Sequence, residues 1–388
     1  MLEVSLDEDG RYHRQELISW WEQGRLAASR VLVVGAGALG NELLKCLALV
    51  GVGRITVIDL DLVESSNLAR CVLFREADEG RPKAEVAARA ARELNPDVRV
   101  EAIVGDVRAD LGLGAFADHD VVLGGLDNRE ARVFINQACW KVGTPWIDGA
   151  IEGLLGIMRV FVPPDSACYE CTLTEQDRRL LAVRRACTLL TREQMLSGKV
   201  PTTVTSASVI AALQVQEAIK LLHKETLPYG FAGKGVAFNG LTHDTYVVSY
   251  RRQDDCLAHE SYEVEAWQSA SEDEPLAEIL DRGMREVGED AVVELERELV
   301  RGLRCASCDE REPGIWPLVG LTERSARCPR CGGERSPELL HTIGPDDQLL
   351  TLRPRDLRLP ADDVLTVRNG ERRVQFRLAV RGSGDGRA

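Results

Sequence analysis

Apolar and polar positions change their spacing repeatedly between residues 30 and 148. A β-branched run over 30–34 ends at a glycine, helical spacing follows over 41–50, and a second β-branched run covers 54–59. This order of strand, turn, helix and strand predicts a parallel βαβ unit. The alternation continues with helices expected at 83–94 and 129–142 and strands expected at 98–104, 120–124 and 146–148. We therefore predict a doubly wound parallel α/β sheet that binds ligands at the carboxyl ends of its strands.

Two flanking segments complete this predicted domain. Residues 1–29 mix charges with scattered apolar residues such as Trp20 and Trp21, which favours a helical arm. After the parallel unit, small and apolar residues over 206–220 indicate a buried helix, and late strands are expected over 236–238 and 245–250. The domain is therefore expected to span residues 30–259, behind its N-terminal arm.

The composition changes after this domain. Residues 260–300 hold 14 Asp or Glu and 3 Arg, a net charge of −11. We predict a solvated acidic linker over 260–275 and a helix over 276–287 within this stretch. A small β-rich region is expected over 346–381, and the glycine-rich tail over 382–388 is expected to be disordered.

Overall charge and composition restrict the class of protein. The 388 residues include 48 Lys or Arg and 62 Asp or Glu, a net charge of −14, which argues against a nucleic-acid or anionic-membrane partner. No apolar run is long enough to span a membrane, and the acidic N-terminus does not read as a secretory signal. We therefore expect a cytoplasmic protein, in which the 11 cysteines serve as metal ligands, nucleophiles or core residues rather than disulfides.

A glycine-rich turn supplies the first candidate site. Gly35, Gly37 and Gly40 lie between the first strand and the first helix, a spacing that lets a nucleotide phosphate or ribose approach the helix N-terminus. Asp59, at the end of the second strand, is placed to accept hydrogen bonds from ribose hydroxyls. Dehydrogenases, methyltransferases and adenylating enzymes share such a turn, and a purely structural tight turn gives the same pattern.

Four downstream motifs distinguish these classes. They are residues 59–70 (DLDLVESSNLAR), 80–84 (GRPKA), 125–128 (GLDN) and 168–172 (CYECT). In this order they resemble the adenylation domain of the ubiquitin-activating enzyme family, which has a Rossmann-like, ThiF/MoeB-type fold. The family also includes adenylyltransferases that activate sulfur carriers in molybdopterin and thiamine synthesis.

Finer similarities point to one branch of this family. Residues 43–45, 78–86 and 167–173 are most similar to the catalytic subunit of the neddylation-activating enzyme. The compact chain lacks the insertions of eukaryotic members, which favours a bacterial member.

The resemblance implies that ATP and Mg²⁺ bind at the carboxyl ends of the strands. Arg70 and Lys83 are cations suited to the phosphates, and Asp127 is expected to hold Mg²⁺ through its carboxylate. Asn67 is expected to donate hydrogen bonds to phosphate. The expected nucleotide site comprises Gly35, Gly37, Gly40, Asp59, Asp61, Asn67, Arg70, Lys83, Asp127 and Asn128. Surface salt bridges for Arg70 and Lys83, and a helix cap at Asp127, are the alternatives.

The resemblance also implies a second subunit. In related enzymes an arginine of an N-terminal Arg-Tyr-x-Arg-Gln motif reaches the partner's site, and residues 11–15 (RYHRQ) fit this motif. Arg14 is therefore the expected finger in trans, which implies a homodimer. Cys71 stands where the family usually has glutamine, a departure that affects a polar contact near the nucleotide.

Cys187 is the candidate nucleophile. It lies sixteen residues past Cys171, the position of the thioester-forming cysteine in the neddylation enzyme, which is also followed by threonine. Two preceding arginines, Arg184 and Arg185, favour the nucleophilic thiolate. The large cysteine-bearing half-domain of eukaryotic members is missing, so Cys187 is expected on a crossover loop at about 174–200. A free structural cysteine is the alternative.

Two groups of residues predict structural Zn²⁺. Cys168 and Cys171 form a Cys-x-x-Cys knuckle, and the resemblance implies partners after the last strands, where Cys256 and His259 stand. Three cysteines and one histidine suit tetrahedral zinc, and buried thiols are the alternative. A zinc ribbon is predicted over 301–345, because two further Cys-x-x-Cys pairs lie 19 residues apart, namely Cys305, Cys308, Cys328 and Cys331.

Together these features predict a homodimeric, ATP-dependent activating enzyme for a ubiquitin-like protein. The modifier is adenylated at its C-terminus, captured by Cys187 as a thioester and passed to a conjugating enzyme. A sulfur-carrier adenylyltransferase without the thioester step is the first alternative, and a catalytically inactive scaffold that binds the modifier is the second. A nicotinamide dehydrogenase is disfavoured because the region beyond Asp59 carries cations directed at phosphate.

Overall fold

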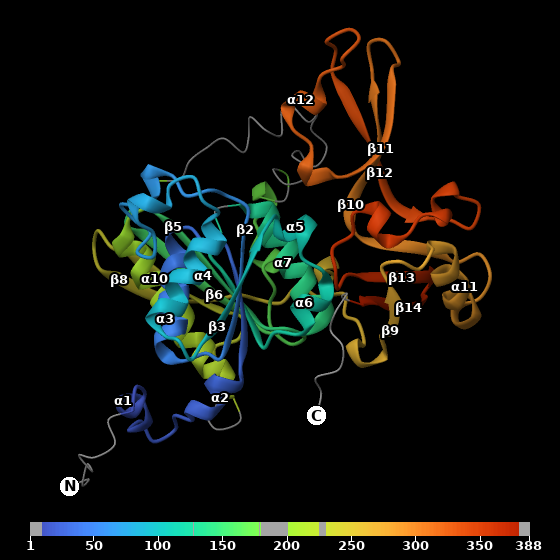
Figure 1. Ribbon diagram of the computed structural model, residues 1–388. Coiled ribbons are helices and arrows are strands. Elements are labelled where there is room, and N and C mark those ends of the chain that lie inside the picture. The colour runs from blue at the N-terminus through green and yellow to red at the C-terminus, as the bar shows by residue number, and fades with distance from the viewer. Residues whose placement is uncertain (1–9, 127, 178, 180–200, 225–229, 380–388) are drawn as a thin grey trace. The chain divides into compact units, whose positions relative to one another are not determined.

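The computed structural model describes residues 10–126, 128–177, 179, 201–224 and 230–379, which belong to two compact units (Figure 1). Unit 1 takes the described residues of Met1–Gly105, Asp118–Thr172 and Val200–Glu260. Unit 2 takes those of Asp106–Ala117, Leu173–Lys199 and Ser261–Ala388. Each unit has its own sheet and is described by itself.

Unit 1 is built on an eight-stranded sheet in the order β3–β2–β1–β4–β5–β6–β7–β8. The strands from β3 to β5 in this order are parallel, and β6, β7 and β8 continue the sheet in antiparallel pairing. This arrangement confirms the predicted doubly wound sheet, and its order reverses between β1 and β4, where such sheets bind ligands. The bounds are β1 Arg30–Val34, β2 Arg54–Asp59, β3 Arg99–Val104, β4 Val121–Gly124, β5 Trp146–Glu152, β6 Leu155–Phe161, β7 Lys234–Asn239 and β8 Asp244–Ser249.

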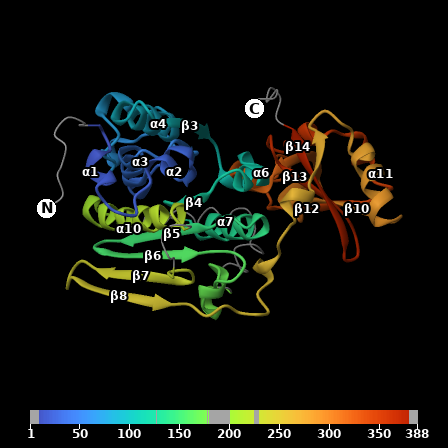
Figure 2. The same ribbon diagram turned by 90° about the horizontal axis from the view of Figure 1, so that it is seen from below.

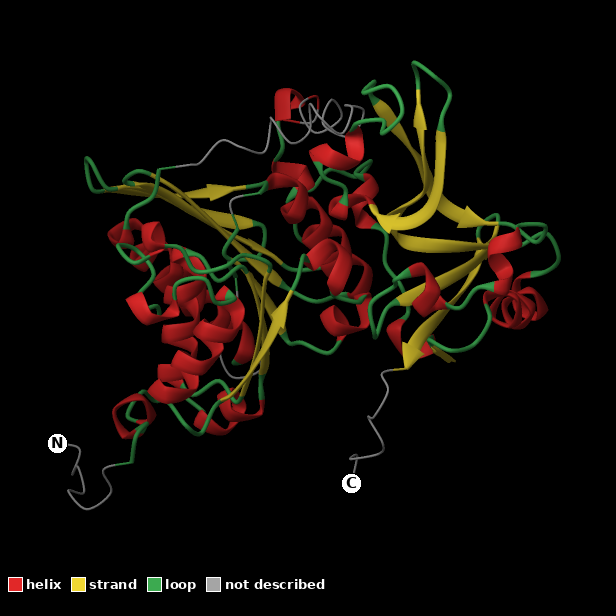
Figure 3. Cartoon of the chain, turned by 45° about the horizontal axis from the view of Figure 1, so that its top comes forward, coloured by secondary structure: helices red, strands yellow, loops and turns green. Residues whose placement is uncertain are grey.

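Helices cover both faces of this sheet (Figure 3). Helices α3, α4 and α10 pack on one face, and α7 lies on the other (Figure 1). Apolar residues spaced four apart along α3, such as Leu43 and Leu47, are fully buried. They share one core with Val33 of β1. The bounds in unit 1 are α1 His13–Glu16, α2 Gln23–Ala28, α3 Ala38–Val50, α4 Lys83–Leu94, α7 Arg129–Val142 and α10 Val204–Leu222. No helix among the described residues is long and apolar enough to cross a membrane.

Unit 2 has a six-stranded sheet in the order β11–β10–β13–β14–β9, with β12 also paired to β10. Helix α11 packs against β10, β13 and β14 (Figure 2). Between them lies a separate core that includes Ile279, Leu365 and Phe376. The bounds are α5 Val107–Asp110, α6 Leu113–Ala117, β9 Gln268–Ser271, α11 Leu276–Val287, β10 Val292–Cys305, β11 Arg311–Pro317, α12 Glu323–Ala326, β12 Arg335–Ile343, β13 Val364–Asn369 and β14 Arg372–Ala379.

The region after residue 260 differs from the expected linker. The helix predicted over 276–287 is present as α11, but strand β9 lies inside the stretch predicted to be solvated and pairs in parallel with β14. Strand β10 crosses the boundary expected at residue 300, so the acidic segment, the cysteine ribbon and the β-rich end share one sheet. The acidic residues of β10 alternate with buried apolar ones, and a half-buried strand tolerates this pattern because its two faces differ.

Candidate functional site

The glycine turn between β1 and α3 is shaped by close backbone contacts. Gly35 has a φ of +96°, and a Cβ there would lie 2.7 Å from the Gly125 carbonyl oxygen. A Cβ on Gly40 would lie 1.9 Å from the Gly35 oxygen, whereas a Cβ on Gly37 would meet no atom within 4 Å. Gly35 and Gly40 are therefore needed for packing, while Gly37 leaves open space before the N-terminus of α3. Free N–H groups at such a helix start favour a phosphate.

Asp59 ends β2 beside this turn. Its Oδ2 accepts a hydrogen bond from the Ala36 amide at 2.6 Å, and its Oδ1 accepts one from the Asp61 amide at 2.8 Å. Burial raises the pKa of Asp59, although these two amides and Lys83 partly oppose the rise. The contacts fix the carboxylate at the carboxyl end of the sheet, and its remaining lone pairs can accept from a ribose.

Lys83 begins α4 and lies near the same strand ends. Its Nζ is 2.8 Å from Asp61 Oδ2, and the lysine side chain is 11% exposed while that of Asp61 is 58% exposed. Burial alone lowers the pKa of Lys83, but the Asp61 hydrogen bond and the nearby Asp59 charge outweigh it and raise the pKa overall. The ammonium is thus charged at neutral pH, in a site largely shielded from water.

Asn67 and Arg70 follow on the loop after β2. Asn67 is buried, and its Oδ1 accepts from the Glu64 amide at 2.9 Å, which caps the 3₁₀ turn Ser65–Asn67. Arg70 donates to the Ser66 carbonyl at 3.3 Å. Burial raises the pKa of Cys71 to about 11, although the charges of Arg70 and Lys83 partly oppose the rise. Cys71 is buried in the core of unit 1, so it is a protonated packing residue.

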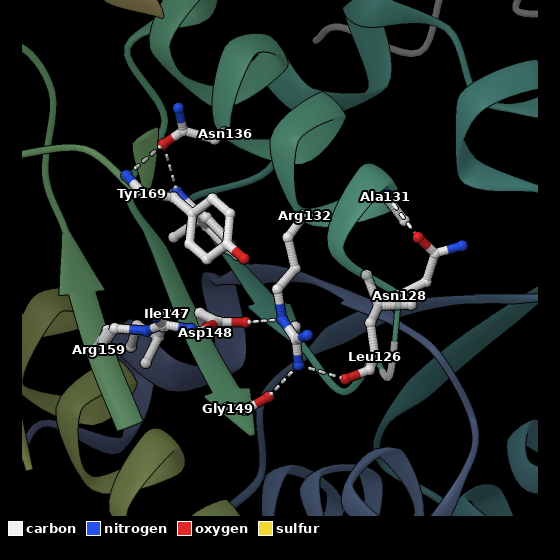
Figure 4. Close-up of polar contacts among 12 residues, drawn as sticks. Leu126, Asn128, Ala131, Arg132, Asn136, Ile147, Asp148, Gly149, Arg159 and Tyr169 are labelled. Atoms are coloured by element: carbon white, nitrogen blue, oxygen red, sulfur yellow. Dashed lines mark hydrogen bonds and ion pairs between the residues drawn. The ribbon is translucent and has the colours of Figure 1, made fainter. Parts of the chain in front are cut away.

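The turn between β4 and α7 holds two further candidates. Asp127 lies outside the described residues. Asn128 is the N-cap of α7, and its Oδ1 accepts from the Glu130 and Ala131 amides at 2.8 and 3.3 Å (Figure 4). The asparagine oxygen therefore stabilises the helix start, and its predicted contact with nucleotide stays a prediction.

A buried ion cluster under this turn was missed by the sequence analysis. Asp148 at β5 is fully buried between Arg132 of α7 and Arg159 of β6 (Figure 4). Burial alone raises the pKa of Asp148, but the two arginines outweigh it and hold this pKa below its usual range. The sequence holds one signal for the cluster. Arg132 follows the helix cap Asn128 by four residues, so both residues lie on the same side of α7.

Arg14 does not join these residues within one chain. The arm is held at the end of α4, where Asn95 Nδ2 donates to the Tyr12 hydroxyl at 2.7 Å and Arg11 donates to the Leu94 carbonyl at 3.3 Å. Lys83 lies at the other end of this 12-residue helix, which is about 18 Å long. Arg14 itself is exposed, so its action on the site requires a second copy of the chain and stays a proposal.

The predicted Cys₃His cluster is assembled in unit 1. The ligand atoms of Cys168, Cys171, Cys256 and His259 all lie within 4.8 Å of one another. Cys168 Sγ is 3.6 Å from Cys171 Sγ and 3.7 Å from Cys256 Sγ, and His259 Nε2 is 3.4 Å from Cys171 Sγ. A hydrogen bond from Cys168 lowers the pKa of Cys171 below its usual range. This donor set can bind zinc, and the ring of His259 is held by stacking on Trp140 with centroids 4.7 Å apart.

The four ribbon cysteines also converge, in unit 2. Cys305 Sγ is 3.5 Å from Cys331 Sγ, and Cys308 Sγ is 3.7 Å from Cys328 Sγ. All four sulfur atoms lie within 4.8 Å of one another, as a tetrahedral Cys₄ site requires. Cys187, the candidate nucleophile, lies outside the described residues.

Both clusters predict a measurable zinc content. We expect Cys168→Ser and Cys308→Ser each to lose about one zinc per chain, because removal of one thiolate opens a four-ligand site. Elemental analysis of the purified chain measures this, with Cys46→Ser as the control because Cys46 belongs to neither cluster. An unchanged zinc content in either cluster variant would contradict the assignment.

The fold and the site define an E1-type adenylation domain. A parallel sheet presents a glycine turn, an acidic residue at the end of its second strand and a shielded lysine at the start of α4. A model described as the ThiF family matches residues 12–258, and the chain belongs to this family.

Several relatives share this domain. The SAMP-activating enzyme E1 of Haloferax volcanii is 35% identical over 259 residues, which cover 65% of this chain and 88% of that protein. The ThiS adenylyltransferase of Escherichia coli is 34% identical over 250 residues, 63% of this chain and 93% of that protein. For mouse MOCS3, an adenylyltransferase and sulfurtransferase, the identity is 35%, and the match covers 66% of this chain and 53% of that protein. The structure of E. coli MccB with ATP shares the fold, with a TM-score of 0.54, 24% identity and coverage of 66% and 75%.

Proposed function

We propose that this protein is an ATP-dependent adenylyltransferase that activates the C-terminal carboxylate of a ubiquitin-like protein. The carboxylate oxygen attacks the α-phosphorus of ATP, the bond from that phosphorus to the bridging oxygen breaks, and pyrophosphate leaves with the electron pair. The products are an acyl-adenylate and pyrophosphate. The observation that carries the proposal is the shielded Lys83 ammonium beside the open glycine turn, since phosphate charge must be neutralised there.

Other residues have proposed roles in the same reaction. Arg70 supplies a second cation for the phosphates, and Asp59 accepts from the ribose. Asp127 is proposed to hold Mg²⁺, which takes carboxylate and phosphate oxygens. Arg14 of a second copy completes the site in a homodimer.

The proposal is tested by ATP–pyrophosphate exchange in the presence of purified β-grasp proteins with a free C-terminal glycine. We expect exchange that requires one such partner and is lost in Asp127→Ala. An inactive scaffold predicts no exchange with any partner, and stabilisation by NAD⁺ but not by ATP with Mg²⁺ would favour a dehydrogenase.

We further propose that Cys187 accepts the acyl group. Its thiolate attacks the adenylate carbonyl, a thioester forms, and AMP leaves before a conjugating enzyme's cysteine takes the acyl group. We expect a modifier–enzyme adduct that thiols cleave and that Cys187→Ala abolishes, as seen on non-reducing gels. A thiol-sensitive adduct that persists in Cys187→Ala would show that another cysteine is the acceptor.

A sulfur-carrier adenylyltransferase is the second candidate. It is favoured by relatives such as the ThiS adenylyltransferase of E. coli, which matches over 93% of its own length. In that case the adenylate forms without an enzyme thioester, and a sulfur donor consumes it. Exchange activity that is fully retained in Cys187→Ala, with no thiol-sensitive adduct in the wild type, would identify this function.

A further inference from the structure

We propose that Arg132 is a positioning residue that holds the turn between β4 and α7 in the shape required for nucleotide binding. This inference rests on the proposed function, in which that turn lies against ATP. Arg132 does not itself need to touch the nucleotide, because it acts on the backbone of the turn.

Arg132 lies in α7, and its side chain contacts both this turn and strand β5. Its side chain is 7% exposed, and its Nε donates to Asp148 Oδ1 at 2.7 Å. Its Nη2 donates to the carbonyls of Gly149, at 3.0 Å, and of Leu126 (Figure 4). One planar guanidinium thus ties the middle of β5 to the residue that directly precedes position 127.

Neighbouring contacts fix the rest of the turn. The Gly125 amide donates to the Val34 carbonyl at 2.8 Å, and Gln214 Nε2 of α10 donates to the Gly124 carbonyl at 2.9 Å. Asn128 caps α7 directly after position 127. Arg132 is a charged donor to this backbone, through the Leu126 carbonyl, and its guanidinium is also bound to Asp148.

Arg159 offers a matched comparison, because it shares the same carboxylate. Its Nε lies 3.1 Å from Asp148 Oδ2, so both arginines neutralise one buried acid. Arg159 points elsewhere, with Nη1 3.4 Å from Thr172 Oγ1 and its guanidinium 4.9 Å from the Tyr169 ring centre. These contacts belong to the Cys168–Thr172 knuckle, and none to the β4–α7 turn is present among the described residues.

The test compares Arg132→Lys with Arg159→Lys. Lysine keeps a charge near Asp148 but cannot reach two carbonyls and a carboxylate at once, because it lacks the planar fork. We expect Arg132→Lys to raise the Kd for Mg·ATP, measured by calorimetry, about 10- to 100-fold, and to raise the KM for ATP in exchange more than it lowers kcat. Arg159→Lys is expected to leave both constants near wild type. We expect Arg159→Lys to lower the zinc content of the protein instead.

Each outcome is decisive. Equal Kd values for the two variants would overturn the positioning role and leave only the shared stabilisation of Asp148. If wild-type protein fails to bind Mg·ATP, the proposed function fails, independently of the comparison. Circular dichroism checks folding first, and Arg132→Gln, which keeps amide donors without a charge, replaces Arg132→Lys if the lysine variant does not fold.

Discussion

Replacing Lys83 with methionine is expected to lower the rate of ATP–pyrophosphate exchange by about 10²-fold or more. The lysine is shielded from water, its pKa is raised by Asp61 and Asp59, and its charge is therefore present when ATP binds. Methionine keeps the apolar stem of the side chain and removes only the ammonium. The lost charge leaves the developing negative charge on the phosphates without a preorganised partner.

The same substitution should barely change folding. Asp61, the partner of Lys83, is 58% exposed, so water solvates its carboxylate when the lysine is gone. We expect the free energy of unfolding to change by about 1 kcal/mol or less. Lys141→Met is the control, because the Lys141 side chain is only 21% exposed and lies 3.6 Å from an acid, Glu260, but sits in the last turn of α7. Equal rates of ATP–pyrophosphate exchange in the two variants would show that Lys83 does not act in the nucleotide site.

Local spacing predicted the features that depend on local geometry. The glycines at positions 35 and 40 were expected because a tight turn before a helix excludes side chains, and the structure has a backbone oxygen where each Cβ would stand. The Cys-x-x-Cys pairs were expected to converge because this spacing places two sulfurs on one turn. His259 was expected from its place after the last strands of the domain, and its Nε2 does lie among the three sulfurs.

Long-range pairing explains what the sequence did not reveal. Asp148 and Arg159 face each other across β5 and β6, and Arg132 reaches them from a helix, so the cluster depends on strand register and helix packing together. A single sequence does not specify that register. The same limit applies to residues 106–117, which lie between two strands of the unit 1 sheet in sequence but pack within unit 2.

Net charge was misleading in one segment. Residues 260–300 have a net charge of −11, most of the chain's net charge of −14, which favoured a solvated linker. In the structure Glu294 and Glu296 alternate with Val293 and Leu295 along β10, and the apolar pair is buried. Period-two alternation was therefore the stronger signal, because a strand needs only one apolar face.

Replacing Arg297 with methionine is expected to destabilise unit 2 by about 3–5 kcal/mol. Arg297 and Asp363 are both buried, and Nε and Nη2 donate to the two carboxylate oxygens at 2.8 and 2.6 Å. The guanidinium also donates to three carbonyls of the 106–117 segment, those of Arg108, Ala109 and Leu111. Methionine fills the space but leaves a buried charge and these carbonyls without their donor.

Arg377→Met provides the control for this loss. Arg377 forms a two-contact ion pair with Asp362, the residue next to Asp363, but its side chain is 29% exposed, so we expect a loss of about 1 kcal/mol or less. Hydrogen exchange measured peptide by peptide is the suitable readout, because a chain of two units need not unfold in one transition. In Arg297→Met, amide hydrogen exchange should become faster in residues 106–117 and in β10. In Arg377→Met it should stay near the wild-type rate.

A double variant separates the charge from the packing. In Arg297→Met with Asp363→Leu the unpaired carboxylate is gone, so much of the lost stability should return, as it does when apolar residues replace a buried ion pair. Recovery should be incomplete, because the three carbonyls lose the contacts of Arg297, and the Leu113 amide, which donates to Asp363 Oδ1 at 3.2 Å, loses that acceptor. Full recovery would assign the whole loss to the buried charge, and no recovery would assign it to the anchoring of residues 106–117.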